Sequence, residues 1–151
     1  MINTTFRKLN TLKKKFYNKK VAVVGDMMLD CYFWGVVNRI SPEAPVPVVE
    51  VDKEFARFGG AMNVAHNIYT LGGLPLPIGV IGNDVDGKLL RNLMKKSGLK
   101  DNGIFIDSSR PTTTKTRVIA QSQHIVRIDK EMNRAINEST QKKIISNNDA
   151  S

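Results

Sequence analysis

The chain has 151 residues, of which 41% are hydrophobic and 25% charged, a composition that suits one modest domain with its own core. No apolar run approaches the roughly 20 residues of a membrane-spanning helix, so we expect no membrane partner. The single cysteine, Cys31, excludes an internal disulfide framework and fits the cytoplasm, where we expect the protein to act. His66 and His124 are isolated and no cluster has metal-ligand spacing, so we expect no metal site.

The first predicted element is a basic helix within residues 1–20. Four apolar residues recur at helical spacing and are predicted to form its inner side: Phe6, Leu9, Leu12 and Phe16. Seven cations precede the first acidic residue: Arg7, Lys8, Lys13, Lys14, Lys15, Lys19 and Lys20. An organelle-targeting peptide would be richer in arginine and serine. We favour a solvated helix face over a nucleic-acid patch, because no interleaved aromatics or base-reading motif accompany the lysines, and the net charge of +9 also suits an anionic small substrate.

Strands are predicted next. The apolar run Val21–Val24, ended by a Gly-Asp pair, predicts a buried parallel strand whose carboxyl end is polar, as at the ligand sites of open α/β sheets. Two further extended segments follow: Cys31–Val37 and Val46–Val51. Pro47 marks the second of these as an edge strand, because proline cannot donate to a ladder. Residues 31–52 therefore predict an antiparallel flap outside the main sheet.

A glycine pair, Gly59 and Gly60, precedes an apolar helical pattern over residues 61–71, which Gly72 ends. Glycines at a helix N-terminus leave backbone N–H groups bare and let a ligand approach closely. Asn63, in the first turn, adds an amide that both donates and accepts hydrogen bonds. This combination suits a polyhydroxylated or anionic ligand, although a tight turn into a packed helix would use the same residues.

The later elements alternate between strands and helices. First come a strand at Leu76–Ile81, a helix that residues 83–87 open and that continues through Lys96, and a strand at Gly103–Ile106. They are followed by a hairpin of Lys115–Ala120 and His124–Asp129, and by a polar tail at 131–151 that frays from Ser146. Pro75 and Pro77 are expected to confine the pairing of the first of these strands to its later part. The hairpin gives a second flap segment at 112–130. The order predicts an α/β fold, a doubly wound sheet with a small antiparallel β flap over the ends of its strands.

Six stretches carry a family pattern in matching order and spacing: Val23–Asp30, Arg39–Val48, Gly59–Ala65, Gly79–Asp84, Thr114–Val118 and Arg127–Asp129. From about Val21 to Lys130 the chain resembles the ribokinase-like carbohydrate kinases, also called the PfkB family. The Gly-Gly-x-x-Asn element is shared across that family, whereas the run from Arg39 to Val48 is most similar to the heptose 7-phosphate kinases. The resemblance implies the N-terminal half of a ribokinase-like sheet with its lid.

The resemblance implies transfer of the γ-phosphoryl group of ATP, with Mg²⁺, to the anomeric hydroxyl of D-glycero-D-manno-heptose 7-phosphate, in ADP-heptose and lipopolysaccharide synthesis. The family's catalytic aspartate lies in a Gly-Ala-Gly-Asp motif of the second half, as does the nucleotide pocket. This sequence has no such motif. The resemblance therefore implies a sugar-binding half, inactive alone, with no catalytic residue and no identifiable ATP ligand. Two alternatives stay open: another PfkB sugar or nucleoside kinase fragment, or a non-catalytic binding or dimerisation module.

The resemblance also assigns binding residues. Asp30 matches an aspartate that accepts hydrogen bonds from sugar hydroxyls, and the family's sugar-contacting element matches Gly59, Gly60 and Asn63. Asp26 suits binding or turn formation equally. The 7-phosphate needs cations, for which the candidates are Arg39, Lys115, Arg117 and Arg127. Lys115 and Arg117 share a strand face and can converge, although each also suits an exposed flap surface.

The resemblance to this family also implies binding partners. The flaps of this family often pair between subunits, so Phe33, Trp34 and Val46–Val51 are predicted to form a homodimer clasp or to cover the cleft of their own subunit. A separate polypeptide carrying a C-terminal kinase half is a further expected partner. The small-molecule partner is a phosphorylated sugar.

Overall fold

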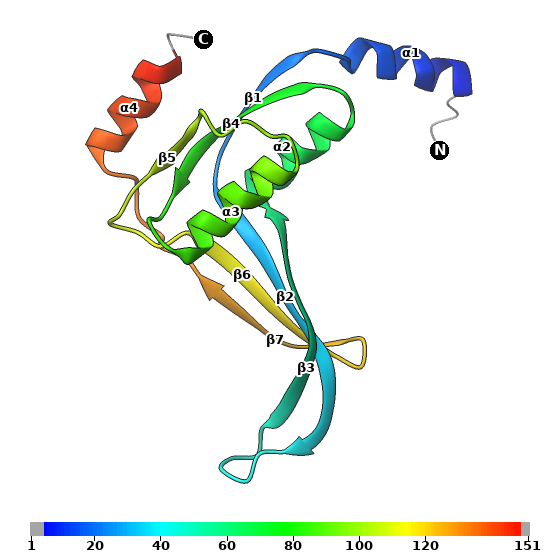
Figure 1. Cartoon of the computed structure of the whole chain (residues 1–151), viewed down its shortest axis with the longest axis vertical. Coiled ribbons are helices and arrows are strands. Elements are labelled where there is room, and N and C mark those ends of the chain that lie inside the picture. The colour runs from blue at the N-terminus through cyan, green and yellow to red at the C-terminus, as the bar shows by residue number, and fades with distance from the viewer. Residues whose placement is uncertain (1–4, 149–151) are drawn as a thin grey trace.

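The computed structural model describes residues 5–148, which form four helices and two β-sheets, with the second and third helices packed on the sheets (Figure 1). The elements are α1 (Phe6–Phe16), β1 (Lys20–Val24), β2 (Met27–Ile40), β3 (Pro47–Gly59), α2 (Gly60–Thr70), β4 (Leu74–Ile81), α3 (Val85–Lys96), β5 (Ile104–Ile106), β6 (Thr113–Ala120), β7 (Gln123–Lys130) and α4 (Glu138–Asn148). The predicted α/β class is confirmed.

The strands form one parallel sheet, in the order β1-β4-β5, and one four-stranded sheet, in the order β3-β2-β6-β7. The four-stranded sheet is the predicted flap. It is mixed rather than antiparallel, because β2 and β6 pair in parallel. The chain between them passes through α2, β4, α3 and β5, and a crossover of this kind returns a strand in the same direction.

The flap is longer than the sequence pattern predicts. β2 begins at Met27 rather than at Cys31, and β3 continues to Gly59 instead of ending at Val51. The two strands stay paired along nearly their whole length, despite two shifts of register. The ribbon they form projects away from the helices (Figure 1). Pro47 lies in the edge strand, as predicted, because β3 is at the end of the strand order.

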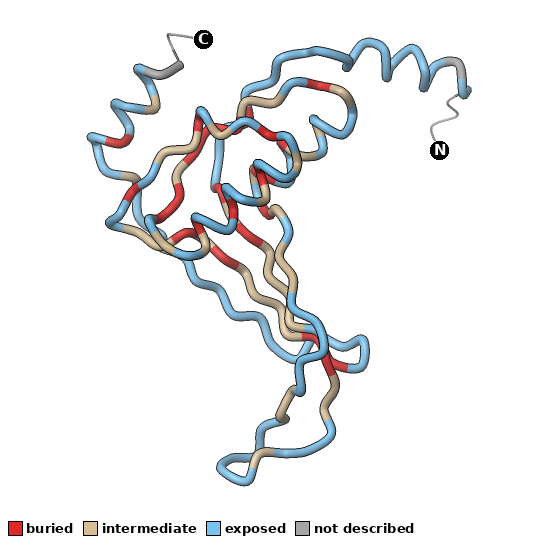
Figure 2. Tube along the Cα trace, viewed as in Figure 1, coloured by how far each residue is buried: buried red, intermediate tan, exposed pale blue. Residues whose placement is uncertain are grey.

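The core lies where α2 and α3 meet the two sheets. Its fully or almost fully buried side chains come from β2, α2, β4, α3 and the turn after α3: Met27, Leu29, Met62, Ile81, Leu90, Met94 and Leu99. Buried residues gather around this junction, whereas the far end of the flap is mostly exposed (Figure 2). The core therefore fixes the root of the flap against the N-terminal end of α2.

β1 is parallel to β4, as predicted, but it is not a buried strand. Within the predicted run Val21–Val24 only Val23 is buried, and Val24 is 72% exposed. The reason is that β1 lies at the edge of its sheet in the described chain.

The expectation that prolines confine the pairing of β4 is wrong. Pro75 and Pro77 lie within the ladder, opposite Val21 and Val23 of β1. β5 pairs only with the last part of β4, Gly79–Ile81. The proline-containing part therefore has a neighbour on one side only, and the missing N–H groups leave no carbonyl of β5 without a donor.

The two ends of the chain differ from expectation in part. α1 is a helix, but the prediction that its apolar side faces inward is wrong, because Phe6, Leu9, Leu12 and Phe16 are all exposed. α1 extends away from the sheets (Figure 1). At the other end, α4 includes Ser146, which the sequence assigned to a frayed tail. Residues 1–4 and 149–151 of the predicted ends lie outside the described residues.

No helix within residues 5–148 is long and apolar enough to cross a membrane.

Asp84 joins α3 to the flap. As the N-cap of α3, its Oδ1 accepts the Gly87 N–H at 2.8 Å and the Thr112 hydroxyl at 2.6 Å. Its Oδ2 accepts the Thr112 N–H at 3.0 Å, and Lys130 of β7 lies 3.4 Å away. Partial burial raises the pKa of Asp84, but these hydrogen bonds and the lysine charge outweigh it and lower the pKa to about 2.

This network predicts a loss of stability in acid. The pKa of Asp84 is lower in the folded than in the unfolded chain, so its contribution is complete above about pH 5 and disappears as the pH falls towards 2. We expect a loss of about 2 kcal/mol in the free energy of unfolding over that range. Urea unfolding of the wild type and of Asp84→Asn checks this, because their difference in stability should shrink with falling pH. A difference that stays constant would contradict it.

Candidate functional site

The glycine pair joins β3 to α2 and places the N-terminus of α2 beside Asp30. Gly60 has a φ of 51°, and a Cβ at this position would lie 2.7 Å from the carbonyl oxygen of Asp26. That carbonyl also accepts the Ala61 N–H at 3.1 Å, which holds the turn against the link between β1 and β2. A Cβ on Gly59 would lie 3.0 Å from Oδ2 of Asp30. Glycine at position 59 therefore lets the Asp30 carboxylate approach the start of the helix, and glycine at position 60 permits the turn itself.

Asp30 is held by Arg117 of β6. Nη1 of Arg117 donates to Oδ1 of Asp30 at 2.6 Å, and the two side chains are only 21% and 23% exposed. The guanidinium also lies 5.4 Å from the centre of the Tyr32 ring. The hydrogen bond to Asp30 raises the pKa of Arg117, although burial opposes it. This contact positions one carboxylate oxygen of Asp30 and leaves the other, Oδ2, beside Gly59.

Asp30 and Asn63 line one open cleft of about 590 Å³, which we call the Asp30 cleft. The other residues that line it come from β2, β3, α2 and α3 or its end: Tyr32, Ala56, Arg57, Phe58, His66, Leu93 and Ser97. The lining thus combines aromatic and aliphatic surfaces with a carboxylate, an amide and a guanidinium. Of the residues predicted from the sequence, Asp30 and Asn63 line this cleft, and Gly59 lies beside Asp30 at the start of α2.

Four residues of this cleft that carry polar groups were not predicted: Tyr32, Arg57, His66 and Ser97. Arg57 lies directly opposite Asp30 in the register of β3 with β2. His66 follows Asn63 by three residues on α2, which places both on one side of the helix, and its ring lies 5.3 Å from that of Phe58. Helical spacing from Asn63 would have found His66. Nothing local marks Arg57, because its place depends on strand register.

Two further predicted phosphate cations, Lys115 and Arg127, lie on the flap with acidic partners. Nζ of Lys115 donates to Asp129 at 3.0 Å and to Glu131 at 3.1 Å, which raises the pKa of Lys115. Arg127 donates to the same Asp129 at 2.9 Å. Arg39 is set apart, because it lies nine residues beyond Asp30 along β2, or about 30 Å at the rise of a strand.

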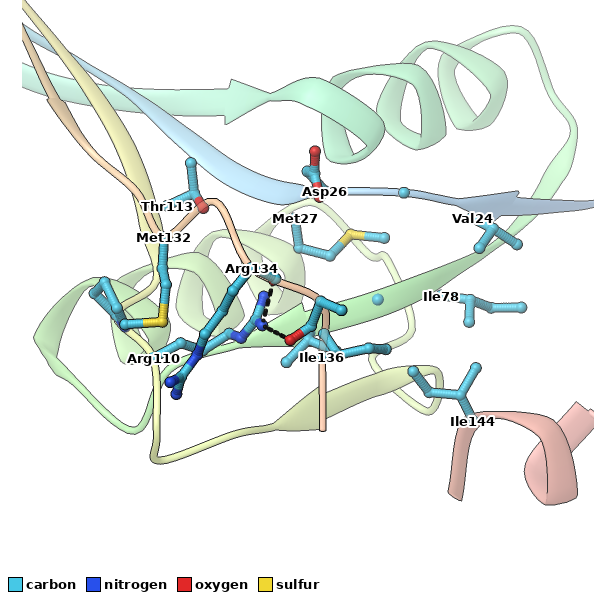
Figure 3. A pocket seen from close by; sticks show the side chains of 15 residues that line it. Val24, Asp26, Met27, Ile78, Arg110, Thr113, Met132, Arg134, Ile136 and Ile144 are labelled. Carbon is cyan, nitrogen blue, oxygen red and sulfur yellow. Dashed lines mark hydrogen bonds between the residues drawn. The ribbon is translucent and has the colours of Figure 1, made fainter. Parts of the chain in front are cut away.

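Asp26 lines a different cleft, of about 320 Å³ (Figure 3). This second cleft lies between β1, β4 and the segment that leads to α4. Arg110 closes one side, where its Nη2 donates to the carbonyl oxygens of Arg134 at 2.9 Å and Ala135 at 3.0 Å. The structure therefore separates the side chain of Asp26 from Asp30, although its carbonyl supports the glycine turn.

Within residues 5–148 no group of three or more histidine, cysteine or acidic residues is arranged to hold a metal ion. The polar atoms of the Asp30 cleft are instead suited to hydroxyl and anionic groups, because they combine one carboxylate with amide, imidazole, hydroxyl and guanidinium donors.

The fold is that of known carbohydrate kinases. A carbohydrate kinase from Agrobacterium tumefaciens matches with a TM-score of 0.60 and 22% sequence identity, over 74% of this chain and 35% of that one. At this identity the likeness shows the fold alone.

Similarity in sequence, unlike similarity in fold alone, shows the family to which the chain belongs. The bifunctional protein HldE of Helicobacter pylori strain P12 is 47% identical over 127 residues, which are 84% of this chain and 28% of the relative. HldE of Magnetococcus marinus is 49% identical over 123 residues, 82% of this chain and 25% of that protein. The chain thus spans about a quarter of these relatives. The family model described as pfkB family carbohydrate kinase matches residues 18–151, so the chain belongs to that family.

Proposed function

We propose that this chain is the sugar-binding and lid part of a kinase that phosphorylates the anomeric hydroxyl of D-glycero-D-manno-heptose 7-phosphate. The observation that carries the proposal is the gathering of Asp30, the glycine pair and Asn63 at the N-terminus of α2. The identity to HldE proteins and the resemblance of the run from Arg39 to Val48 to heptose kinases support a heptose as the sugar. Lipopolysaccharide synthesis and a cytoplasmic site of action belong to the same proposal.

The chemistry of sugar binding follows from the cleft. Oδ2 of Asp30 accepts hydrogen bonds from sugar hydroxyls, while the hydrogen bond from Arg117 to Oδ1 holds the carboxylate in place. Asn63 both donates and accepts, so it can bind a neighbouring hydroxyl in either direction. First-turn N–H groups of α2 other than that of Ala61, which donates to Asp26, add further donors close to the ligand, because no side chain of Gly59 or Gly60 intervenes.

Positioning of the sugar is the contribution that we assign to this chain. Kinases of the pfkB family use ATP. Phosphoryl transfer depends chiefly on orientation and charge stabilisation, so a fixed acceptor hydroxyl is a substantial part of catalysis. We assign no residue here to the catalytic base, to ATP or to Mg²⁺, and we propose that the chain alone does not transfer phosphate.

We also propose that the projecting flap mediates contact with a second subunit. Trp34 and Val51 on the ribbon of β2 and β3, and Val46 directly before β3, are between 41% and 51% exposed. Exposed apolar residues on a long projecting ribbon favour burial against another chain. A separate polypeptide that supplies a C-terminal kinase half remains a further proposed partner.

The sugar site is tested by Asn63→Ala. We expect this variant to bind D-glycero-D-manno-heptose roughly 5-fold more weakly in isothermal titration calorimetry, because it loses one or two neutral hydrogen bonds. Asn67→Ala is the matched control, since Asn67 is an exposed asparagine one turn further along α2 that does not line the cleft. Equal affinities of both variants and the wild type would remove Asn63 from the site.

A further inference from the structure

Arg57 is a cation of the Asp30 cleft to which the structure gives no carboxylate partner. It is exposed on β3, lines the cleft and lies opposite Asp30 in the strand register. Its guanidinium lies 5.2 Å from the centre of the Phe55 ring. None of the ion pairs found among residues 5–148 includes Arg57. Its N–H donors are therefore directed to solvent or to a ligand.

The other cations near this face are already engaged. Arg117 is bonded to Asp30, Lys115 to Asp129 and Glu131, and Arg127 to Asp129. Each would have to leave a carboxylate before binding an anion, and the carboxylate left behind would repel that anion. Arg57 has no such competitor among the described residues.

The charge of the cleft also favours Arg57 as the residue that binds an anion. Arg117 compensates the carboxylate of Asp30, so the remaining fixed charge among the lining residues is the guanidinium of Arg57. A guanidinium presents a planar set of donors that binds two phosphate oxygens at once, and the contact with Phe55 limits the orientations of that plane. His66 and Ser97 line the same cleft and offer further donors.

We infer that Arg57 binds the phosphate group of a phosphorylated sugar whose hydroxyls are bound by Asp30 and Asn63. The inference rests on the proposed function, because it takes the same cleft as the sugar site. The phosphate group is thus bound by a residue of the edge strand β3, whereas Arg117 of β6 positions Asp30.

The test compares two ligands, D-glycero-D-manno-heptose 7-phosphate and the same heptose without phosphate, by titration calorimetry on the full 151-residue chain. The wild type should bind the phosphorylated sugar on the order of 10-fold more tightly, as expected for a charge-assisted hydrogen-bond pair. Arg57→Ala should abolish this preference and leave the affinity for the plain heptose unchanged. Arg57→Lys should retain part of it, and Lys53→Ala, an exposed cation on the same strand outside the cleft, should retain all of it.

Each other outcome is decisive. A preference that survives in Arg57→Ala, or an equal loss of affinity for both sugars, would overturn the role of Arg57. Equal binding of both sugars by the wild type would overturn the phosphate subsite and leave the sugar site standing. Binding of neither sugar to a wild type with a normal circular dichroism spectrum would overturn the proposed function itself.

Discussion

Asp30→Asn should weaken the binding of D-glycero-D-manno-heptose by on the order of 10-fold or more. The substitution removes the charge that makes the carboxylate a strong acceptor, and it breaks the 2.6 Å ion pair with Arg117. Both side chains of the pair are mostly shielded from solvent. Loss of the ion pair would therefore also free the asparagine side chain from the position in which Arg117 holds Asp30. Titration calorimetry with the plain heptose measures the effect, because that ligand does not involve the phosphate subsite.

Asp52→Asn is the control for this experiment. Asp52 is an exposed aspartate of the same β-ribbon that does not line the cleft, and its substitution changes the net charge by the same amount. We expect its affinity for the heptose to equal that of the wild type. An Asp30→Asn variant that binds as tightly as Asp52→Asn would remove Asp30 from the sugar site.

Gly60→Ala should lower the free energy of unfolding by roughly 2–4 kcal/mol. The residue has a φ of 51°, and its new Cβ would lie 2.7 Å from the carbonyl oxygen of Asp26 and 2.9 Å from Cε of Met28. The methionine can move, but the backbone carbonyl cannot without shifting the link between β1 and β2. Urea unfolding measures the loss.

Gly25→Ala provides the comparison for Gly60→Ala. Gly25 does not belong to the glycines with a positive φ. A Cβ added at this position would meet only the Cβ of Ala61, at 3.1 Å. We therefore expect a clearly smaller loss of stability. If Gly60→Ala were as stable as Gly25→Ala, the requirement for glycine at the start of α2 would be refuted.

Local patterns predicted the parts of the site that are close together in the chain. The glycine pair and Asn63 were found because glycines before an apolar helical repeat mark a helix start. The hairpin of β6 and β7 was also found, and its turn at Gln121 and Ser122 has φ values of 50° and 66°. These features depend on a few neighbouring residues, which is why the sequence alone shows them.

Contacts between residues that are far apart in the chain could not be predicted from local sequence patterns. The partners Asp30 and Arg117 are 87 residues apart, and their contact depends on the parallel pairing of β2 with β6. Arg57 gains its place only from the register of β3 with β2. Asp26 and Asp30 both follow the first strand, but the chain changes sheet between them and separates their side chains into two clefts.

The most direct test of the proposed sugar site is a titration of the isotope-labelled chain with D-glycero-D-manno-heptose 7-phosphate, monitored by the NMR chemical shifts of its backbone amides. We expect the largest shifts at Asp30, Arg57 and Asn63, which line the Asp30 cleft, and at the adjacent Gly59 and Gly60. Amides of the second cleft, such as those of Val24 and Arg110, should change little. Shifts confined to that second cleft, or no shifts at all in a folded chain, would contradict the assignment of the Asp30 cleft as the sugar site.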